Sequence, residues 1–219
     1  MPKCLVFFRQ TKHINWAYEW LVAELNQRSL EITEKQVEMY HLSTDDPVKK
    51  QIVAEFMVPH SMLRVVLCST SFSMGINLRN VRLVVHYGAA NDIDSYIQET
   101  GRAGRSPDED SHAVVLLYKH CLSSKNISSN MKTYIRSTEC RRKLLLADYM
   151  DGREVASPQP SHKCCDLCAN TCTCGDCPSP ICPVYVTYEA TTESDKSDSD
   201  IELYRRKPVL VLSESDSDA

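Results

Sequence analysis

Residues 63–68 read Leu-Arg-Val-Val-Leu-Cys and pass directly into the polar stretch 69–71, Ser-Thr-Ser. A short, largely apolar run bounded by hydroxyl residues is typical of a buried strand that ends in a loop. Similar runs recur at residues 4–8, 37–41, 82–87 and 113–118. Between them lie longer stretches, and residues 15–27 space their apolar side chains at helical intervals. This alternation predicts an α/β domain with a parallel sheet covered on both faces.

Beyond residue 119 the chain changes character. Residues 134–150 have the pattern of a single helix with a basic side, a cysteine-rich segment follows, and residues 189–219 are rich in Ser, Asp and Glu. We therefore expect three parts, at 1–122, 123–188 and 189–219. The last should be a disordered acidic tail, because it has almost no core-forming periodicity.

Composition excludes some classes of protein. Hydrophobic residues make up 42% of the 219, too many for a wholly disordered chain. No apolar run approaches a membrane span, and the N-terminus turns polar at Arg9, so we expect a soluble intracellular protein. The net charge of the whole chain is −4, and the tail alone holds nine acidic and four basic residues. Residues 1–188 are therefore close to neutral. Bulk charge therefore neither favours nor excludes nucleic acid as a partner.

Eight of the eleven cysteines lie between residues 140 and 182, and clustered thiols without a secretory signal suggest metal ligands. Cys165 and Cys168 have knuckle spacing, and Cys140 with Cys164 would complete a tetrahedral zinc site. His162 is an alternative to Cys164 as a ligand, and reduced thiols are the alternative to any metal. A second cluster, Cys172, Cys174, Cys177 and Cys182, leaves three possibilities open: another metal ion, ligand exchange with the first site, or a reducible loop.

Residues 96–105 read Tyr-Ile-Gln-Glu-Thr-Gly-Arg-Ala-Gly-Arg. Arg102 and Arg105, each preceded by glycine, are expected on one side of a helix start. Guanidinium forks match phosphate oxygens and keep their charge, so such a pair suits a γ-phosphoryl group in transfer. Two ordinary surface arginines are the alternative.

The loop after residue 68 is a second candidate site. Ser69, Thr70 and Ser71 follow a strand at the edge where open α/β sheets bind ligands, and Gly75 permits close approach of the backbone. An ordinary strand-to-loop turn is the alternative.

Two further features suggest binding partners. A basic group could contact nucleic-acid phosphates, or form a solvated helix face: Lys132, Arg136, Arg141, Arg142 and Lys143. In the tail, Val209, Leu210, Val211 and Leu212 precede acidic serine repeats. This run resembles a SUMO-interacting motif, which adds a strand to a partner's sheet, although short apolar runs also occur by chance.

Taken in order, residues 5–8, 68–77 and 98–105 resemble motifs IV, V and VI of superfamily 2 helicases. Met-Gly-Ile-Asn at 74–77 and Gln-Glu-Thr-Gly-Arg-Ala-Gly-Arg at 98–105 are most similar to the RecQ family. Residues 139–145 together with 164–168 resemble the RecQ zinc subdomain, a helical hairpin closed by four ligands. The resemblance covers roughly residues 3–170.

The resemblance implies a second RecA-like lobe of a 3′→5′ DNA helicase that acts in the nucleus in repair, recombination or replication. Gln98, Gly75, Arg102 and Arg105 would then face ATP and Mg²⁺ across a cleft, while residues 69–77 would couple hydrolysis to the DNA strand. The DNA partner would be a junction of single strand and duplex. Ser73 departs from the glycine usual at its position.

One requirement of that activity is missing from the sequence. No Gly-x4-Gly-Lys-Ser/Thr loop occurs among the six glycines, and there is no Asp-Glu-x-His box. We therefore expect the chain to be inactive alone and to need a first helicase lobe as a partner. The competing interpretation is a non-catalytic, zinc-dependent DNA-binding or adaptor module.

Overall fold

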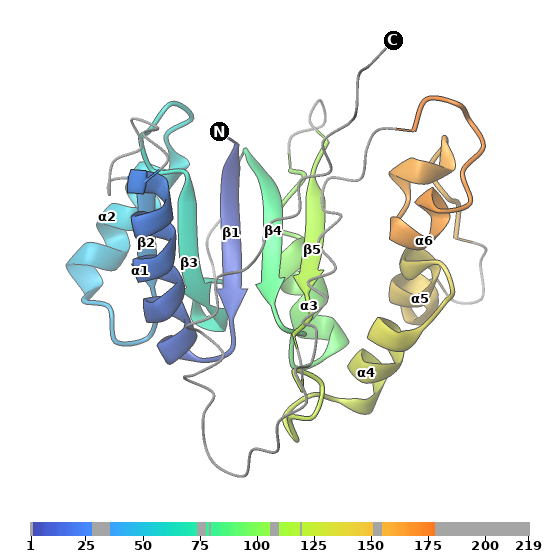
Figure 1. The fold of residues 1–219 in the computed structure, drawn as a ribbon, viewed down its shortest axis with the longest axis horizontal. Coiled ribbons are helices and arrows are strands. Elements are labelled where there is room, and N and C mark those ends of the chain that lie inside the picture. The colour runs from blue at the N-terminus through green and yellow to red at the C-terminus, as the bar shows by residue number, and fades with distance from the viewer. Residues whose placement is uncertain are drawn as a thin grey trace. The chain divides into compact units, whose positions relative to one another are not determined.

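The computed structural model describes residues 2–27, 36–73, 78, 80–105, 110–118, 120–150 and 155–177. Within them lies a five-stranded sheet of order β2-β3-β1-β4-β5 in which every pairing is parallel (Figure 1). The strands are β1 (Lys3–Phe8), β2 (Val37–Tyr40), β3 (Val65–Ser69), β4 (Val81–Tyr87) and β5 (His112–Leu116). The predicted α/β class is confirmed, and the five predicted strands correspond to these five.

Helices cover both faces of this sheet, as a parallel sheet requires. They are α1 (Thr11–Gln27), α2 (Asp46–Met57) and α3 (Ile93–Thr100). Alternate side chains of β1 show the two layers: Leu5 and Phe7 share a core cluster with Phe56 of α2, whereas Phe8 shares another with Ile14 of α1. The central strand is therefore buried from both sides.

The helical part after the sheet contains α4 (Ser129–Arg136), α5 (Arg141–Leu146) and α6 (Asp166–Ala169), with 3₁₀ turns at Ala147–Tyr149 and Ser161–Lys163. The prediction of one helix over 134–150 was wrong, because residues 137–140 separate α4 from α5. Ser137 has an extended conformation (φ −65°, ψ 147°), and its Oγ accepts a hydrogen bond from the Glu139 N–H at 3.0 Å. Such a local side-chain bond competes with the helical pattern.

A third core cluster attaches α4 to the sheet domain. Met131 and Tyr134 of α4 pack with Ala89 and Ala90, which follow β4, and with Tyr96 of α3. The predicted boundary at residue 122 stays a prediction, and the tail at 189–219 lies outside the described residues. Among those residues, no helix is long and apolar enough to cross a membrane.

Candidate functional site

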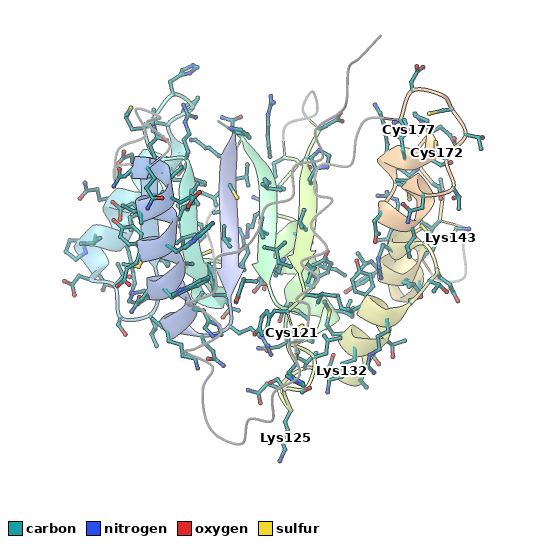
Figure 2. All side chains as sticks on the ribbon, in the orientation of Figure 1. Cys121, Lys125, Lys132, Lys143, Cys172 and Cys177 are labelled. Carbon is teal, nitrogen blue, oxygen red and sulfur yellow. The ribbon has the colours of Figure 1, made fainter. Side chains whose placement is uncertain are left out.

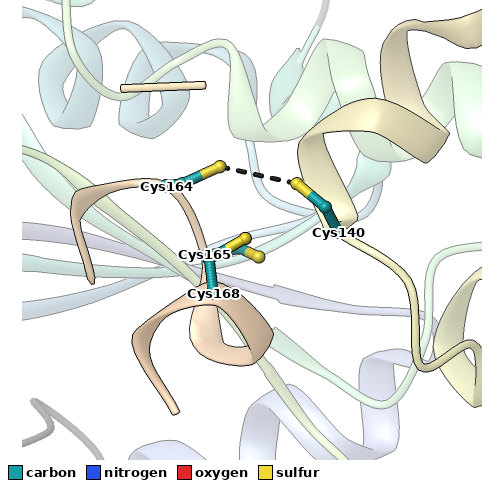
Figure 3. Close-up of side chains that lie close together, drawn as sticks. All are labelled: Cys140, Cys164, Cys165 and Cys168. Atoms are coloured by element: carbon teal, nitrogen blue, oxygen red, sulfur yellow. Dashed lines mark hydrogen bonds between the residues drawn. The ribbon is translucent and has the colours of Figure 1, made fainter. Parts of the chain in front are cut away.

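Four cysteines from two separate segments come together in the helical part. Cys140 lies just before α5, Cys164 and Cys165 lie just before α6, and Cys168 is on α6. Their sulfur atoms all lie within 4.8 Å of one another, and the Sγ atoms of Cys140 and Cys164 are 3.5 Å apart (Figure 3). Four thiolates around one zinc ion, each about 2.3 Å from it, would stand roughly 3.8 Å from one another. The cluster therefore fits a tetrahedral metal ion.

Electrostatics favour one thiolate in this cluster. Burial raises the pKa values of the Cys164 and Cys168 thiols. Burial would also raise the pKa of Cys140, but hydrogen bonds from the Lys143 backbone and the thiols of Cys164 and Cys168 outweigh it and lower that pKa to about 7. Because the thiolate is the form that ligates metal, Cys140 is prepared for binding near neutral pH.

Arg141 joins the two ligand segments. Its Nε donates to Asp166 Oδ1 at 3.1 Å and a terminal nitrogen donates to Asp166 Oδ2 at 3.2 Å. Another terminal nitrogen donates to the Tyr134 carbonyl at 2.7 Å, and the guanidinium lies over the Tyr134 ring. Arg141, predicted to contact DNA, thus has internal partners, whereas Arg136 and Arg142 are exposed.

His162 does not join the four thiols. Its Nδ1 lies 3.6 Å from the Sγ of Cys172 instead, so Cys164 and not His162 is the fourth member of the first cluster. Sequence reasoning missed this pairing of His162 with Cys172. The signal available in the sequence was that His162 lies ten residues before Cys172, a thiol that is not part of the first cluster.

The arginine-bearing segment follows the end of a helix, which corrects the prediction of a helix start. Asp92 caps the start of α3, and its carboxylate accepts a hydrogen bond from the Ser95 N–H at 2.7 Å; the helix ends at Thr100, with Gly101 as its C-cap. Gly104 has φ +69°, a left-handed conformation that favours glycine, and its N–H donates to the Val81 carbonyl at 3.2 Å. The segment therefore leads from α3 toward the first residue of β4.

The two arginines have different surroundings. Arg102 is only 7% exposed, and burial, followed by the charge of Arg105, lowers its pKa. Arg105 is exposed, and its Nε donates to the Gly101 carbonyl at 3.1 Å; Gln98 on α3 is exposed as well. Guanidinium keeps its charge in proteins, so an anion beside Arg102 would offset the penalty of burying it.

A buried hydrogen-bonded pair that sequence reasoning missed fixes α3 to the sheet. His86 Nε2 and Glu99 Oε2 are 2.7 Å apart, and each residue is 2% exposed. Phe7 of β1 stacks on the His86 ring at a centroid distance of 5.4 Å. Glu99 follows the buried Tyr96 by three residues, which places both on one helix face, and this spacing was the signal available.

The segment with hydroxyl side chains, residues 69–71, follows a strand as the sequence predicted. Ser69 ends β3 at its carboxyl end, and Thr70 begins a 3₁₀ turn, Thr70–Ser73. Gly75 and the side chain of Ser71 lie outside the described residues. Because the strands are parallel, Ser69 stands at the carboxyl edge of the sheet, whereas Gly104 is bonded at the amino end of β4.

The exposed side of α4 supplies a basic surface. Lys132 and Arg136 line a shallow depression with Ser129, Thr133, Ser137 and Thr138. Lys132 and Lys143 both belong to the helical part (Figure 2). Lysine, arginine and hydroxyl side chains are the groups that usually contact nucleic-acid phosphates.

Comparison with known proteins shows that the chain is similar to helicases. Residues 1–107 match the family described as helicase conserved C-terminal domain. Among curated relatives, the ATP-dependent RNA helicase R290 of Acanthamoeba polyphaga mimivirus is 31% identical over 61% of this chain. The mouse exonuclease/helicase WRN is 27% identical over 68%, and the ATP-dependent DNA helicase RecQ of Haemophilus influenzae is 30% identical over 59%.

The chain corresponds to only part of these proteins: the matches cover 26%, 12% and 22% of their respective lengths. Among solved structures, domain 2 of the DEAD-box helicase Mss116p bound to an RNA duplex matches with 19% identity and a TM-score of 0.46, over 60% of this chain and 55% of that one. Residues 1–107 are thus similar to the helicase conserved C-terminal domain family, and about two thirds of the chain is similar in sequence to parts of the helicases WRN and RecQ.

Proposed function

We propose that this chain supplies the second lobe of an ATP-dependent, 3′→5′ DNA helicase of RecQ type. The observation that carries the proposal is the helicase C-terminal domain match over residues 1–107, which contains Arg102 and Arg105 in the turn after α3. A first lobe with a Gly-x4-Gly-Lys-Ser/Thr loop would have to come from elsewhere, because this sequence contains none. Nuclear location and a role in repair stay predictions.

The two arginines would act on ATP held by that first lobe. Arg105, exposed at the end of the turn, would reach the γ-phosphate and neutralise the charge that develops during transfer. Arg102, buried behind it, would bind a second oxygen and anchor the turn. Gln98, exposed on α3, would orient the same phosphate.

The helical part would bind zinc and DNA. Zinc supplies a rigid tetrahedral centre, and Cys140, Cys164, Cys165 and Cys168 would hold it and so fix α5 to α6. Lys132, Arg136 and Arg142 would contact DNA phosphates. Changing Lys132 or Arg136 to alanine should reduce the slope of log affinity against log salt by about 0.7 per lost contact with single-stranded DNA.

The tail proposal concerns residues 209–212, outside the described residues. If this segment binds SUMO, replacing Val209 and Leu210 with alanine should remove SUMO from a pull-down while leaving DNA binding intact.

The deciding experiment measures ATP hydrolysis by the zinc-loaded chain with and without single-stranded DNA, and then with a first lobe fused upstream. We expect no turnover from the chain alone and DNA-stimulated turnover from the fusion. In the fusion, Arg105→Lys should lower the rate about 10³-fold, because lysine keeps the charge but loses the planar fork. Arg82→Lys, at an exposed position of β4, is the matched control. Turnover by the chain alone would contradict the proposal.

The same experiment separates the competing function. The missing phosphate loop favours a non-catalytic zinc-dependent DNA-binding or adaptor module. That function predicts DNA binding by the chain but no hydrolysis from any fusion, and no effect of Arg102 or Arg105 replacements.

A further inference from the structure

Two pairs of metal-ligating side chains lie outside the four-thiol cluster. His162 Nδ1 is 3.6 Å from Cys172 Sγ. Further along, the Sγ atoms of Cys174 and Cys177 are 3.5 Å apart. The first cluster already has the four sulfur ligands that a structural zinc site needs, so neither pair is required there.

The chain itself connects the two pairs. Cys172 and Cys174 are separated by one residue, and covalent geometry alone keeps their α-carbons within about 7 Å. Cys174 and Cys177 have the Cys-x2-Cys spacing of a zinc knuckle. Three thiols and one imidazole form a complete tetrahedral ligand set, and soft sulfur ligands with imidazole select zinc over magnesium or calcium.

We propose that His162, Cys172, Cys174 and Cys177 bind a second zinc ion, distinct from the one at the first cluster. Nδ1 of His162 would be the coordinating nitrogen, because it is the ring atom beside Cys172.

The local structure explains why this segment would need a metal. Its elements are a 3₁₀ turn at Ser161–Lys163 and the four-residue helix α6, and neither contains a buried residue. So short a segment buries too little apolar surface to offset its conformational entropy. A second ion would supply that missing free energy and fix the residues that follow α6.

The test is native mass spectrometry of the full 219-residue chain, purified with zinc under a phosphine reductant. We expect two zinc ions per chain. Cys172→Ser and Cys177→Ser should each leave one, and so should Cys140→Ser, which removes a ligand of the other site. Thr173→Ala is the matched control, since it changes an exposed residue between two proposed ligands and should keep both ions.

A second measurement uses the wild-type chain, so it does not depend on whether a variant folds. Thiols are alkylated with and without a zinc chelator, and each cysteine is quantified by peptide mapping. Cys172, Cys174 and Cys177 should be protected at least tenfold by zinc, and Cys121, buried outside both clusters, should show no zinc dependence.

Several outcomes would overturn the proposal. One zinc ion in the wild-type chain, retained by Cys172→Ser, would show that only the first cluster binds. A single ion lost in both Cys140→Ser and Cys172→Ser would indicate ligand exchange between clusters. Alkylation of Cys174 and Cys177 that ignores zinc but follows the reductant would indicate a redox-active pair. Because none of these readouts involves ATP or DNA, they are independent of the helicase proposal.

Discussion

Lys3, although charged, is 2% exposed and lies at the start of the central strand. Its ammonium donates to the carbonyls of Phe56 and Val58, the latter at 2.6 Å, where α2 ends. The Nζ also lies 5.2 Å from the centre of the Phe56 ring. A cation at a helix C-terminus satisfies carbonyls that have no partner inside the helix. Lys3 therefore links β1 to the end of α2.

Replacing Lys3 with methionine tests this role. Methionine retains most of the apolar stem but donates no hydrogen bond, so the α2 carbonyls lose their partner. We expect the free energy of unfolding to fall by about 1–3 kcal/mol in urea denaturation. Lys50→Met, at an exposed position of α2, should change it by less than about 0.5 kcal/mol. Equal effects of the two substitutions would contradict the assigned role.

The pH dependence of stability gives a second test of Lys3. Burial, followed by the charge of Arg64, lowers the pKa of Lys3 below its ordinary 10.5. Between the folded and unfolded values the unfolded chain holds one more proton, so the free energy of unfolding rises as pH increases toward 10.5. Other groups titrate in this range, so the measurement is the difference between wild type and Lys3→Met. That difference should grow with pH; a flat difference would contradict the lowered pKa.

Residues differ in how well the sequence predicts their environment. The four thiols were predictable because Cys164, Cys165 and Cys168 lie close together in the sequence with metal-ligand spacing. Only Cys140 is distant from them along the chain. Lys3, by contrast, is 53 residues from Phe56, and its burial depends on how β1 meets α2. The His86–Glu99 pair likewise depends on the packing of α3, which no single segment encodes.

At the scale of elements, α5 and α6 contain six and four residues, and neither buries a residue. Isolated helices of this length are unstable in water, so contacts from outside must hold them. Arg141 provides such contacts through Asp166 and the Tyr134 carbonyl. A local side-chain contact likewise explains the incorrect prediction of a single helix over 134–150. Hydrophobic spacing continued across the gap, but the Ser137 side chain redirected the backbone.

Arg141→Lys is the corresponding prediction. Lysine retains the charge, but it cannot pair with both oxygens of Asp166 and also reach the Tyr134 carbonyl. We expect backbone amides of residues 140–146 and 166–169 to exchange with deuterium about tenfold faster, and zinc to dissociate faster. Arg142→Lys, exposed on the same helix, should leave both rates unchanged. If both variants behaved alike, the contacts of Arg141 would not hold these helices.

At the scale of the whole molecule, three hydrophobic core clusters stabilise different parts of the described structure. Two of them lie on opposite faces of the sheet and contain the large buried side chains of β1, β3 and α2. The third joins α4 to α3 through Tyr134 and Tyr96, whose rings are 5.4 Å apart. Beyond α4, the described residues form no comparable cluster. The parallel sheet was predictable because its strands are apolar and regularly spaced. In contrast, α5 and α6 bury no residue, and the clearest sequence signal for how they come together is the spacing of the cysteines beside them.

This division predicts how the protein responds to loss of metal. Chelating zinc from the loaded chain should increase hydrogen–deuterium exchange in residues 140–172, while amides of β1 and β3 stay protected, because the sheet clusters contain none of the first cluster's ligands. Cys165→Ser should reproduce this pattern without chelator, whereas Cys172→Ser should affect only residues near the second site. Concerted exchange of sheet and hairpin would instead mean that the metal centre stabilises the whole fold. Tyr134 and Tyr96 would then be the contacts that transmit its loss, and replacing Tyr134 with alanine should uncouple the two parts.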